Sequence, residues 1–237
     1  MNILQFSNNS INPQDYIIWE SGHESLFLLT ASITHGEVLH RHMELLISYD
    51  PQDVTTEELE RLLAQLPEWR REKALSFLKP IDRVLCAEAY LLLCRILEEK
   101  YGICEQPSFA YGHNGKPVLE HYPDIHFNLS HCHRGVLCVV DDKPVGCDIE
   151  EFSSELHRDL CQWCFSQDET SHILASDAPI EEFTRLWTMK EAMLKLSGEG
   201  LRDDMAGLLT PDTLAVVDMQ TIVNREHGLA YSICRYK

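Results

Sequence analysis

The sequence is short of positive charge. Its 237 residues include 20 Lys and Arg against 38 Asp and Glu, which gives a formal net charge of −18 at pH 7. A surface of this sign repels the phosphates of nucleic acids and of anionic lipids, so we expect neither as a partner. An anionic ligand would have to meet a local group of basic side chains or a bound metal ion.

Long hydrophobic runs are also missing. No segment approaches the roughly 20 consecutive apolar residues that a membrane-spanning helix needs. The first ten residues (MNILQFSNNS) carry neither the basic region nor the apolar region of a secretory signal. We therefore expect a cytoplasmic protein without a membrane span. The apolar fraction of 44% is that of a globular protein with a sizeable core.

Cysteines are present, but their pattern does not indicate disulfides. The chain has nine, an odd number at irregular spacing, and we expect most of them to be reduced core residues. Cys161 and Cys164 form a C-x-x-C pair. Because no second pair exists and the stretch is helix-like, core packing is favoured there over a zinc or redox site.

The residue pattern predicts an α+β fold, with helices and short antiparallel strands in each half. The predicted helices cover residues 57–64, a segment that begins at Pro67, 82–101, 157–164, 167–175 and 180–197. The predicted strands cover residues 26–32, 125–129, 136–140, 145–150, 214–217 and 229–235. A polar turn at 141–144 divides the chain into an amino-terminal half (1–142) and a carboxy-terminal half (143–237).

Two carboxylates stand on one predicted strand. Residues 146–150 read GCDIE, and the alternation of side chains along a strand places Asp148 and Glu150 on one face. Neighbouring carboxylates repel each other, and a hard cation such as Mg²⁺ removes that repulsion. Gly146 leaves room for a close backbone approach. The alternative is a solvated strand face, because D-x-E is common on its own.

The predicted helix at 180–197 carries charged groups on one side. Trp187, Glu191 and Lys195 recur every four residues, away from the apolar side that packs inward. Glu191 can supply a third acidic ligand or a base, and Lys195 follows one turn later. The alternative is an ordinary Glu–Lys helix pair worth only about 0.3–0.5 kcal/mol.

A strand end presents Ser130 and His131. A Ser–His nucleophile is disfavoured, because adjacent residues rarely reach proton-transfer geometry and no G-x-S-x-G elbow surrounds the serine. Both side chains can instead hydrogen-bond to a phosphate. The basic positions at which a polyanion could dock are Arg70, Lys73, Arg83 and Lys116.

These motifs, in this order, resemble those of the Sfp-type 4′-phosphopantetheinyl transferases. The resemblance runs from about residue 68 to residue 201. It is carried by residues 114–117 (NGKP), 127–131 (FNLSH), 146–150 (GCDIE), 165–169 (FSQDE) and 187–201 (WTMKEAMLKLSGEGL). The last block completes the pattern W-x-x-K-E-A-x-x-K-x-x-G-x-G-L. Each motif alone is common, whereas their joint occurrence is specific.

The resemblance implies two similar α+β halves related by a pseudo-twofold axis, with coenzyme A in the cleft between them, and a monomeric protein. It implies that Asp148, Glu150 and Glu191 bind Mg²⁺. Lys195 would contact the phosphates and help the leaving group depart. The reaction implied is attack by a serine of an apo acyl or peptidyl carrier protein on coenzyme A, with Glu191 as the base.

The resemblance also implies a set of nucleotide contacts. His131 would contact the phosphate at the ribose 3′ position, with Ser130 nearby, and Lys116 would help to hold the nucleotide. Lys73 aligns with a phosphate-binding lysine of the family. Arg70 and Arg83 complete the implied set; Arg70 falls where some members carry lysine.

Two other functions fit part of the pattern. The first is a metal-dependent phosphohydrolase or nuclease that uses the same three carboxylates, although the net charge of −18 argues against a nucleic-acid substrate. The second is a non-catalytic scaffold that binds coenzyme A or a carrier protein. Such a scaffold would be expected to have lost an acidic ligand or the helix lysine, and the sequence retains all of them.

Overall fold

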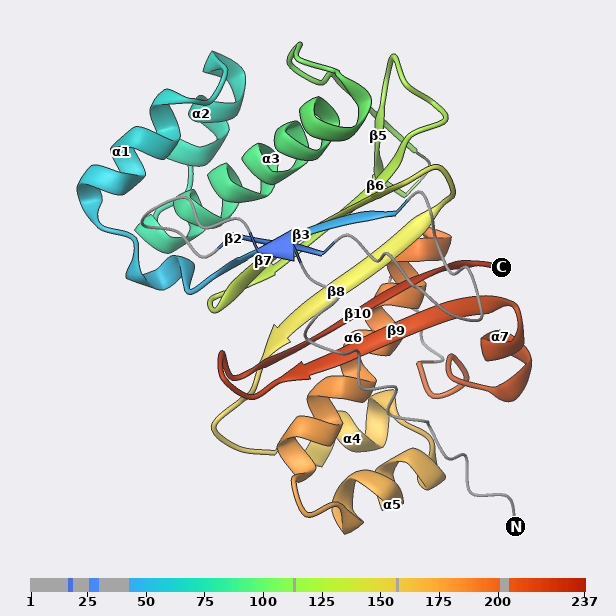
Figure 1. The fold of residues 1–237 in the computed structure, drawn as a ribbon. Coiled ribbons are helices and arrows are strands. Elements are labelled where there is room, and N and C mark those ends of the chain that lie inside the picture. Colours follow the sequence, from blue (N-terminus) through green and yellow to red (C-terminus); the bar gives the residue numbers. More distant parts are fainter. Residues whose placement is uncertain (1–16, 19–25, 30–42, 113, 157, 201–204) are drawn as a thin grey trace.

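The computed structural model describes residues 17–18, 26–29, 43–112, 114–156, 158–200 and 205–237 (Figure 1). The elements of the amino-terminal half are β1 (Ile17–Ile18), β2 (Leu26–Leu29), β3 (Glu44–Tyr49), the 3-10 helix η2 (Pro51–Asp53), α1 (Thr56–Ala64), α2 (Glu68–Leu75), α3 (Pro80–Tyr101), β4 (Phe109–Tyr111), β5 (Pro117–Leu119), β6 (His126–Cys132) and β7 (Gly135–Asp141). Those of the carboxy-terminal half are β8 (Val145–Glu151), α4 (Arg158–Cys164), α5 (Gln167–Ala175), α6 (Pro179–Ser197), α7 (Pro211–Ala215), β9 (Val217–Asn224) and β10 (Leu229–Tyr236).

The strands form two larger antiparallel sheets and one hairpin. The first sheet has the order β1-β2-β3-β7-β6, the second has the order β8-β10-β9, and β4 pairs with β5. The predicted α+β class is confirmed. Among the described residues, no helix is both long enough and apolar enough to cross a membrane.

The two halves share a topology. In each, a first strand (β3 or β8) leads through two short helices to a long helix (α3 or α6). A later hairpin (β6–β7, which comes after β4–β5, or β9–β10, which comes after α7) pairs through its second strand with β3 or β8, which gives the orders β3-β7-β6 and β8-β10-β9. The proposed boundary at 142/143 falls in the turn between β7 and β8. The pseudo-twofold relation and the division into two domains stay predictions.

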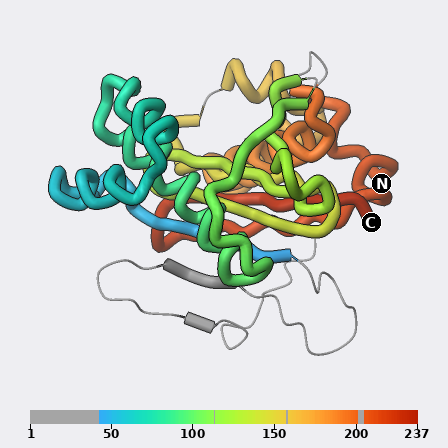
Figure 2. Tube along the Cα trace, turned by 90° about the horizontal axis from the view of Figure 1, so that it is seen from above, coloured from blue at the N-terminus to red at the C-terminus, as the bar shows by residue number. Residues whose placement is uncertain are grey.

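The halves are joined by a common core. Along β7, Val136, Cys138 and Val140 pack against α3, whereas Leu137 and Val139 face β8 and β10. Apolar side chains of β3, β8 and β10 complete the second cluster. In Figure 2, seen from above, the blue β3 and the red β10 accordingly lie in adjacent layers although they are far apart in sequence. The strands therefore form the centre of the molecule, and α3 and α6 cover their outer faces.

Local sequence signals explain most helix ends. Thr55 and Glu58 form a capping box at the start of α1, and Ser166 and Glu169 form another at α5. Helices α3 and α6 end at Gly102 and Gly198, which adopt left-handed backbone angles (φ 68° and 70°). All nine cysteines are free; seven are buried, Cys94 and Cys104 being the others, in line with the prediction of reduced core residues.

One predicted strand is wrong, four strands (β1, β3, β4 and β5) were not predicted, and others differ from the predictions in length. Residues 214–217 do not form a strand, because Thr210 and Thr213 cap a short helix, α7, that has Pro211 in its first turn. Strand β9 begins only at Val217 and runs to Asn224. Strand β3 had no counterpart among the predictions. The predicted strand 26–32 corresponds to β2 up to Leu29, and its remaining residues lie outside the described part.

Helix α6 approaches β8 most closely at Gly146. A Cβ atom on this glycine would lie 2.1 Å from the carbonyl oxygen of Ala192 and 2.4 Å from the amide nitrogen of Leu196. Both are backbone atoms, so no side-chain rotation could relieve the contact. Gly146 thus sets the distance between the strand that carries Asp148 and the helix that carries Lys195.

We expect Gly146→Ala to lower the free energy of unfolding by about 3 kcal/mol or more, because α6 would have to move off the sheet. Gly112→Ala is the matched control, since its Cβ would meet only the carbonyl oxygen of Lys116 at an ordinary 3.6 Å. The control should change stability by less than about 1 kcal/mol. Urea denaturation followed by circular dichroism measures both, and equal effects would contradict this account of the packing.

Candidate active site

Strand β8 presents its carboxylates toward α6. Val145, Cys147 and Ile149 are buried in the core shared by the two sheets. Because side chains alternate along a strand, Asp148 and Glu150 point to the opposite face. Asp148 is only 2% exposed, so its charge requires compensation.

The compensation comes from Lys195 on the last turns of α6. Its Nζ donates to Asp148 Oδ1 at 2.6 Å and to Ser130 Oγ at 2.8 Å. Ser130 Oγ in turn donates to the same Asp148 Oδ1 at 2.8 Å. A carboxylate from β8, an ammonium from α6 and a hydroxyl from β6 therefore form one closed group. The sequence predicted all three residues, but not that they touch one another.

Strand β6 also holds the free edge of β8 through side chains. The backbone N–H of Cys147 donates to Asn128 Oδ1 at 2.9 Å, and the N–H of Ile149 donates to Ser130 Oγ at 3.3 Å. Residues 128 and 130 share a face of β6, just as residues 147 and 149 share an edge of β8. We call this four-residue junction the seam. Sequence reasoning missed Asn128, although the N-x-S spacing on a strand was the available signal.

Charge crowding shifts the titration of the carboxylates. Burial, followed by repulsion from Asp148, raises the pKa of Glu150 to about 7, although Lys195 and a hydrogen bond from Trp187 oppose the shift. The same two causes raise the pKa of Glu191, again against Lys195. The three carboxylates are therefore close enough to act on one another's charge.

The two basic groups near these carboxylates shift in opposite directions, since the pKa of Lys195 is raised and that of His131 is lowered. Desolvation disfavours the charged form of Lys195, but the charge and hydrogen bond of Asp148, together with Cys147 and Glu191, raise the pKa of the lysine. Desolvation, followed by the Lys195 ammonium, lowers the pKa of His131, while Asp82 at the start of α3 and Asp148 act in the other direction. His131 thus belongs electrostatically to the same group, although its side chain remains accessible to solvent.

A metal ion fits these residues in chemistry. Within the described residues, no three His, Cys, Asp or Glu side chains are gathered as closely as a formed metal site requires. However, Asp148 Oδ2 is buried and has no hydrogen-bond partner, which is costly for a carboxylate oxygen. A divalent cation would satisfy that oxygen and relieve the repulsion among the three carboxylates. The donor set is oxygen only, as Mg²⁺ prefers.

The other predicted basic residues are engaged elsewhere or exposed. The Arg70 guanidinium donates to the carbonyl oxygen of Cys86 at 3.1 Å and lies 5.4 Å from the ring centroid of Tyr90, so it packs α2 against α3. Arg83 Nε donates to the carbonyl oxygen of Phe77 at 2.9 Å. Lys73 is exposed on α2. The structure does not bring these three residues into the group around Asp148.

Lys116 lies at the carboxyl end of α6. Its Nζ donates to the carbonyl oxygens of Val145, Lys195 and Leu196 at 3.2, 2.6 and 3.3 Å. An ammonium has three donors, so all of them are used within the protein. This arrangement favours a structural role, whereas the sequence predicted a contact with a nucleotide.

An open cavity of about 470 Å³ lies on the other side of Glu150. Its walls are formed largely by α4, α6 and the chain that follows β8, with Leu160, Phe183 and Trp187 among the lining residues. The cavity therefore combines apolar side chains with polar ones, which include the carboxylates of Glu150 and Glu151.

The chain resembles known transferases in the segment that contains β8 and α6. The family model of the 4′-phosphopantetheinyl transferase superfamily matches residues 144–233. The 4′-phosphopantetheinyl transferase psf-1 of Bacillus pumilus is 38% identical over 160 residues, which cover 61% of this chain and 67% of that protein. This chain belongs to the 4′-phosphopantetheinyl transferase superfamily. The three carboxylates, Asp148 and Glu150 on β8 and Glu191 on α6, all lie in the matched segment.

Further members of the family give a consistent result. The 4′-phosphopantetheinyl transferase Sfp of Bacillus subtilis (strain 168) is 31% identical over 156 residues, or 65% of this chain and 69% of that protein. The 4′-phosphopantetheinyl transferase AcpT of Escherichia coli (strain K12) is 38% identical over 96 residues, or 39% of this chain and 49% of that protein. The predicted membership of an Sfp-type transferase family is confirmed.

We expect Asn128→Leu to lower the free energy of unfolding by about 1–3 kcal/mol, because it leaves the buried N–H of Cys147 without an acceptor. Gln65→Leu is the control: its amide donates to the carbonyl oxygen of Arg61 in an exposed turn, and the change should stay within about 0.5 kcal/mol. Denaturant unfolding of both variants tests the seam. A loss at Asn128 no larger than that at Gln65 would show that the seam does not stabilise the protein.

Proposed function

We propose that this protein transfers the 4′-phosphopantetheine group of coenzyme A to a serine hydroxyl of an apo acyl or peptidyl carrier protein. The observation that carries the proposal is the group formed by Asp148, Lys195 and Ser130 at the junction of β6, β8 and α6. Membership of the transferase superfamily supports it, because β8 and α6 lie in the matched segment.

The reaction is a displacement at phosphorus. The carrier serine oxygen bonds to the phosphorus atom next to the pantetheine, and the bond from that phosphorus to the bridging oxygen breaks. Adenosine 3′,5′-bisphosphate leaves with the bridging oxygen, and the serine proton goes to a base. Positioning and charge neutralisation account for most of the catalysis in such a transfer.

We assign Asp148, Glu150 and Glu191 to a Mg²⁺ ion. When bound, the ion neutralises charge on the diphosphate and orients its oxygens. Asp148 Oδ2 offers a buried oxygen that has no hydrogen-bond partner among the described residues, which supports the assignment. Glu150 and Glu191 carry the remaining negative charge beside it.

We assign Lys195, whose ammonium is bonded to Asp148 and Ser130, to stabilising the charge that develops on the leaving phosphate. We assign proton removal to Glu191, which lies one helical turn before Lys195. Ser130 and His131 would contact phosphate oxygens from the end of β6. Arg83, near the start of α3, and the exposed Lys73 could contact the nucleotide; Arg70 contributes through the packing of α2 on α3.

The proposal extends to where and in what form the protein acts. A cytoplasmic location and a monomeric state follow from the sequence and from the repeated topology of the halves, and both stay predictions. A phosphohydrolase is not favoured, since the matched family and the named relatives are transferases. A non-catalytic scaffold is not favoured, since the acidic residues and the helix lysine of the family motifs are all retained.

Incubation of an apo carrier protein with this protein, coenzyme A and Mg²⁺ should add the mass of one phosphopantetheine group to the carrier. EDTA should abolish the gain, because the ion neutralises the diphosphate. Intact-mass spectrometry over fatty-acid and peptide-synthetase carriers measures the gain. Coenzyme A hydrolysed without transfer would point to a phosphohydrolase, and intact coenzyme A with no gain on any carrier would point to a scaffold.

We expect Asp148→Asn, Glu191→Gln and Lys195→Ala each to lower kcat by about 10²-fold or more, because each removes charge stabilisation or the base. Glu155→Gln, at an exposed position close in sequence, should retain full activity. Circular dichroism spectra would show whether the variants keep the fold. Full activity in all three site variants would refute the assigned site.

A further inference from the structure

The turn between β4 and β5 lies against the carboxyl end of α6. Asn114 Nδ2 donates to the carbonyl oxygen of Gly198 at 2.8 Å, while Lys116 Nζ donates to the carbonyl oxygens of Lys195 and Leu196. These contacts join residues about 80 positions apart in the chain, across the boundary between the two halves. We call Asn114 and Lys116 the clamp.

The end of a helix has a specific need for such donors. The last four carbonyl groups of an α-helix have no partner within the helix, and the aligned peptide dipoles make that end negative. An ammonium and an amide N–H₂ satisfy both requirements. Asn114 and Lys116 therefore donate hydrogen bonds to the carbonyl oxygens at the end of α6, as amide and basic side chains do when they stabilise helix termini.

Both the stem and the ammonium of Lys116 contact the rest of the protein. Its Cδ lies 3.5 Å from where a Cβ of Gly198 would be, so the lysine stem packs on this glycine. Its third donor reaches the carbonyl oxygen of Val145, at the start of β8. Burial lowers the pKa of Lys116, which is the cost of holding this charge away from water. All three N–H donors of the ammonium are thus directed at backbone carbonyl oxygens.

The clamp acts on the residue that completes the active site. Lys195 has its carbonyl oxygen bonded to Lys116 and its ammonium bonded to Asp148. On the same stretch of helix, Gly146 of β8 meets the backbone of Ala192 and Leu196. The last turns of α6 are thus held by β8 on one side and by the clamp on another.

We propose that Lys116 and Asn114 are positioning residues, which fix the carboxyl end of α6 so that Lys195 reaches Asp148, and that Lys116 does not bind the nucleotide. The inference rests on the proposed function for its kinetic consequence. Its structural part, the restraint of α6, does not depend on any activity.

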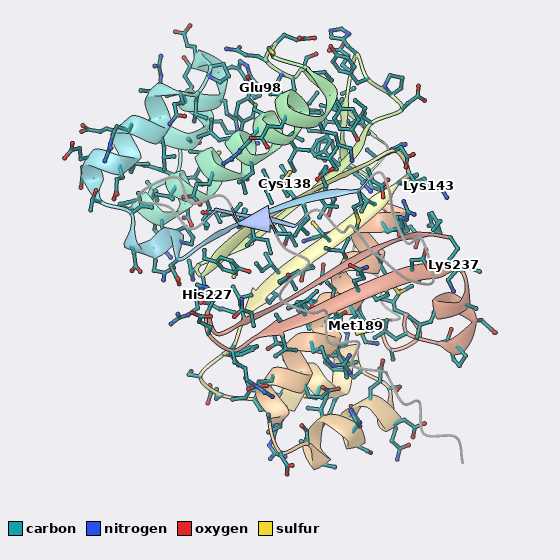
Figure 3. The ribbon with its side chains drawn as sticks, viewed as in Figure 1. Glu98, Cys138, Lys143, Met189, His227 and Lys237 are labelled. Carbon is teal, nitrogen blue, oxygen red and sulfur yellow. The ribbon has the colours of Figure 1, made fainter. Side chains whose placement is uncertain are left out.

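The kinetic test compares Lys116→Met and Asn114→Ala with Lys143→Met. Lys143 is exposed in the turn between β7 and β8 and lies at the edge of the molecule in Figure 3, so it controls for the loss of one positive charge. A positioning role lowers kcat of Lys116→Met by about 10²-fold, the loss that a misplacement of about 1 Å produces. The Kd for adenosine 3′,5′-bisphosphate, measured by calorimetry, then stays within twofold of wild type.

The proposal is overturned if Lys116→Met weakens nucleotide binding instead of lowering kcat alone. If Lys116 binds a phosphate, Lys116→Met weakens the Kd for adenosine 3′,5′-bisphosphate tenfold or more and makes binding less dependent on salt. Asn114→Ala carries no charge change, so a several-fold loss of kcat at unchanged Kd supports positioning. If Lys116→Met fails to fold, Asn114→Ala decides, and wild-type kcat in that variant refutes the clamp.

Hydrogen exchange separates the clamp from the proposed reaction. In the protein without substrate, Lys116→Met and Asn114→Ala should speed exchange of the amides at the carboxyl end of α6, and Lys143→Met should not. Unchanged exchange in both clamp variants would overturn the proposal even if wild-type protein is an active transferase. Faster exchange with an inactive wild type would leave the clamp standing and reject the proposed function.

Discussion

The site depends on the seam between β6 and β8. There, side chains of β6 accept the hydrogen bonds that the backbone of the edge strand β8 would otherwise donate to a neighbouring strand. Among the described residues, strand β8 pairs with β10 on one side and with no strand on the other, and its buried N–H groups at Cys147 and Ile149 need other acceptors. Asn128 and Ser130 supply them. Leaving such a donor unsatisfied costs about 1–3 kcal/mol, so the position of β8, and with it Asp148, is determined by β6. Ser130 serves both purposes, since the same hydroxyl contacts the N–H of Ile149 and the Asp148 carboxylate.

The second constraint is the distance between β8 and α6. Gly146 permits a backbone contact that any side chain would prevent, and this contact brings Lys195 to within hydrogen-bond distance of a buried carboxylate. In a chain of net charge −18, a single ammonium cannot neutralise three crowded carboxylates. Burial, together with repulsion from Asp148, raises the pKa values of Glu150 and Glu191. The site therefore combines three crowded carboxylates, to which the proposed Mg²⁺ would bind, with one buried lysine ammonium.

Sequence reasoning succeeded where structure is determined locally. The helices predicted at 57–64 and 82–101 correspond to α1 and α3, and local signals fix their ends: a capping box at Thr55 and the left-handed Gly102. The faces of β8 and α6 follow from their periodicities, which placed Asp148 and Lys195 on functional surfaces. The strand predicted at 214–217 failed because the cap at Thr210 was overlooked, although it too is local.

The remaining features required the tertiary structure. Strand β3 pairs with β7, about ninety residues later, and nothing in its own sequence specifies that partner. The seam and the clamp likewise join residues that are distant in the chain. A basic residue in a family motif suggests a ligand contact, yet Lys116 uses its three donors on backbone carbonyls. Which atoms a long side chain reaches depends on elements that only folding brings near.

The seam has a consequence for how the halves can exist apart. A carboxy-terminal half released from β6 would present β8 as an open strand edge, with Cys147 and Ile149 N–H groups unpaired and Val145 uncovered. Exposed, apolar strand edges recruit other strands and lead to aggregation. The amino-terminal half thus acts as a built-in cover for β8. This dependence favours keeping both halves in one polypeptide, because neither sheet presents a self-sufficient surface at their junction.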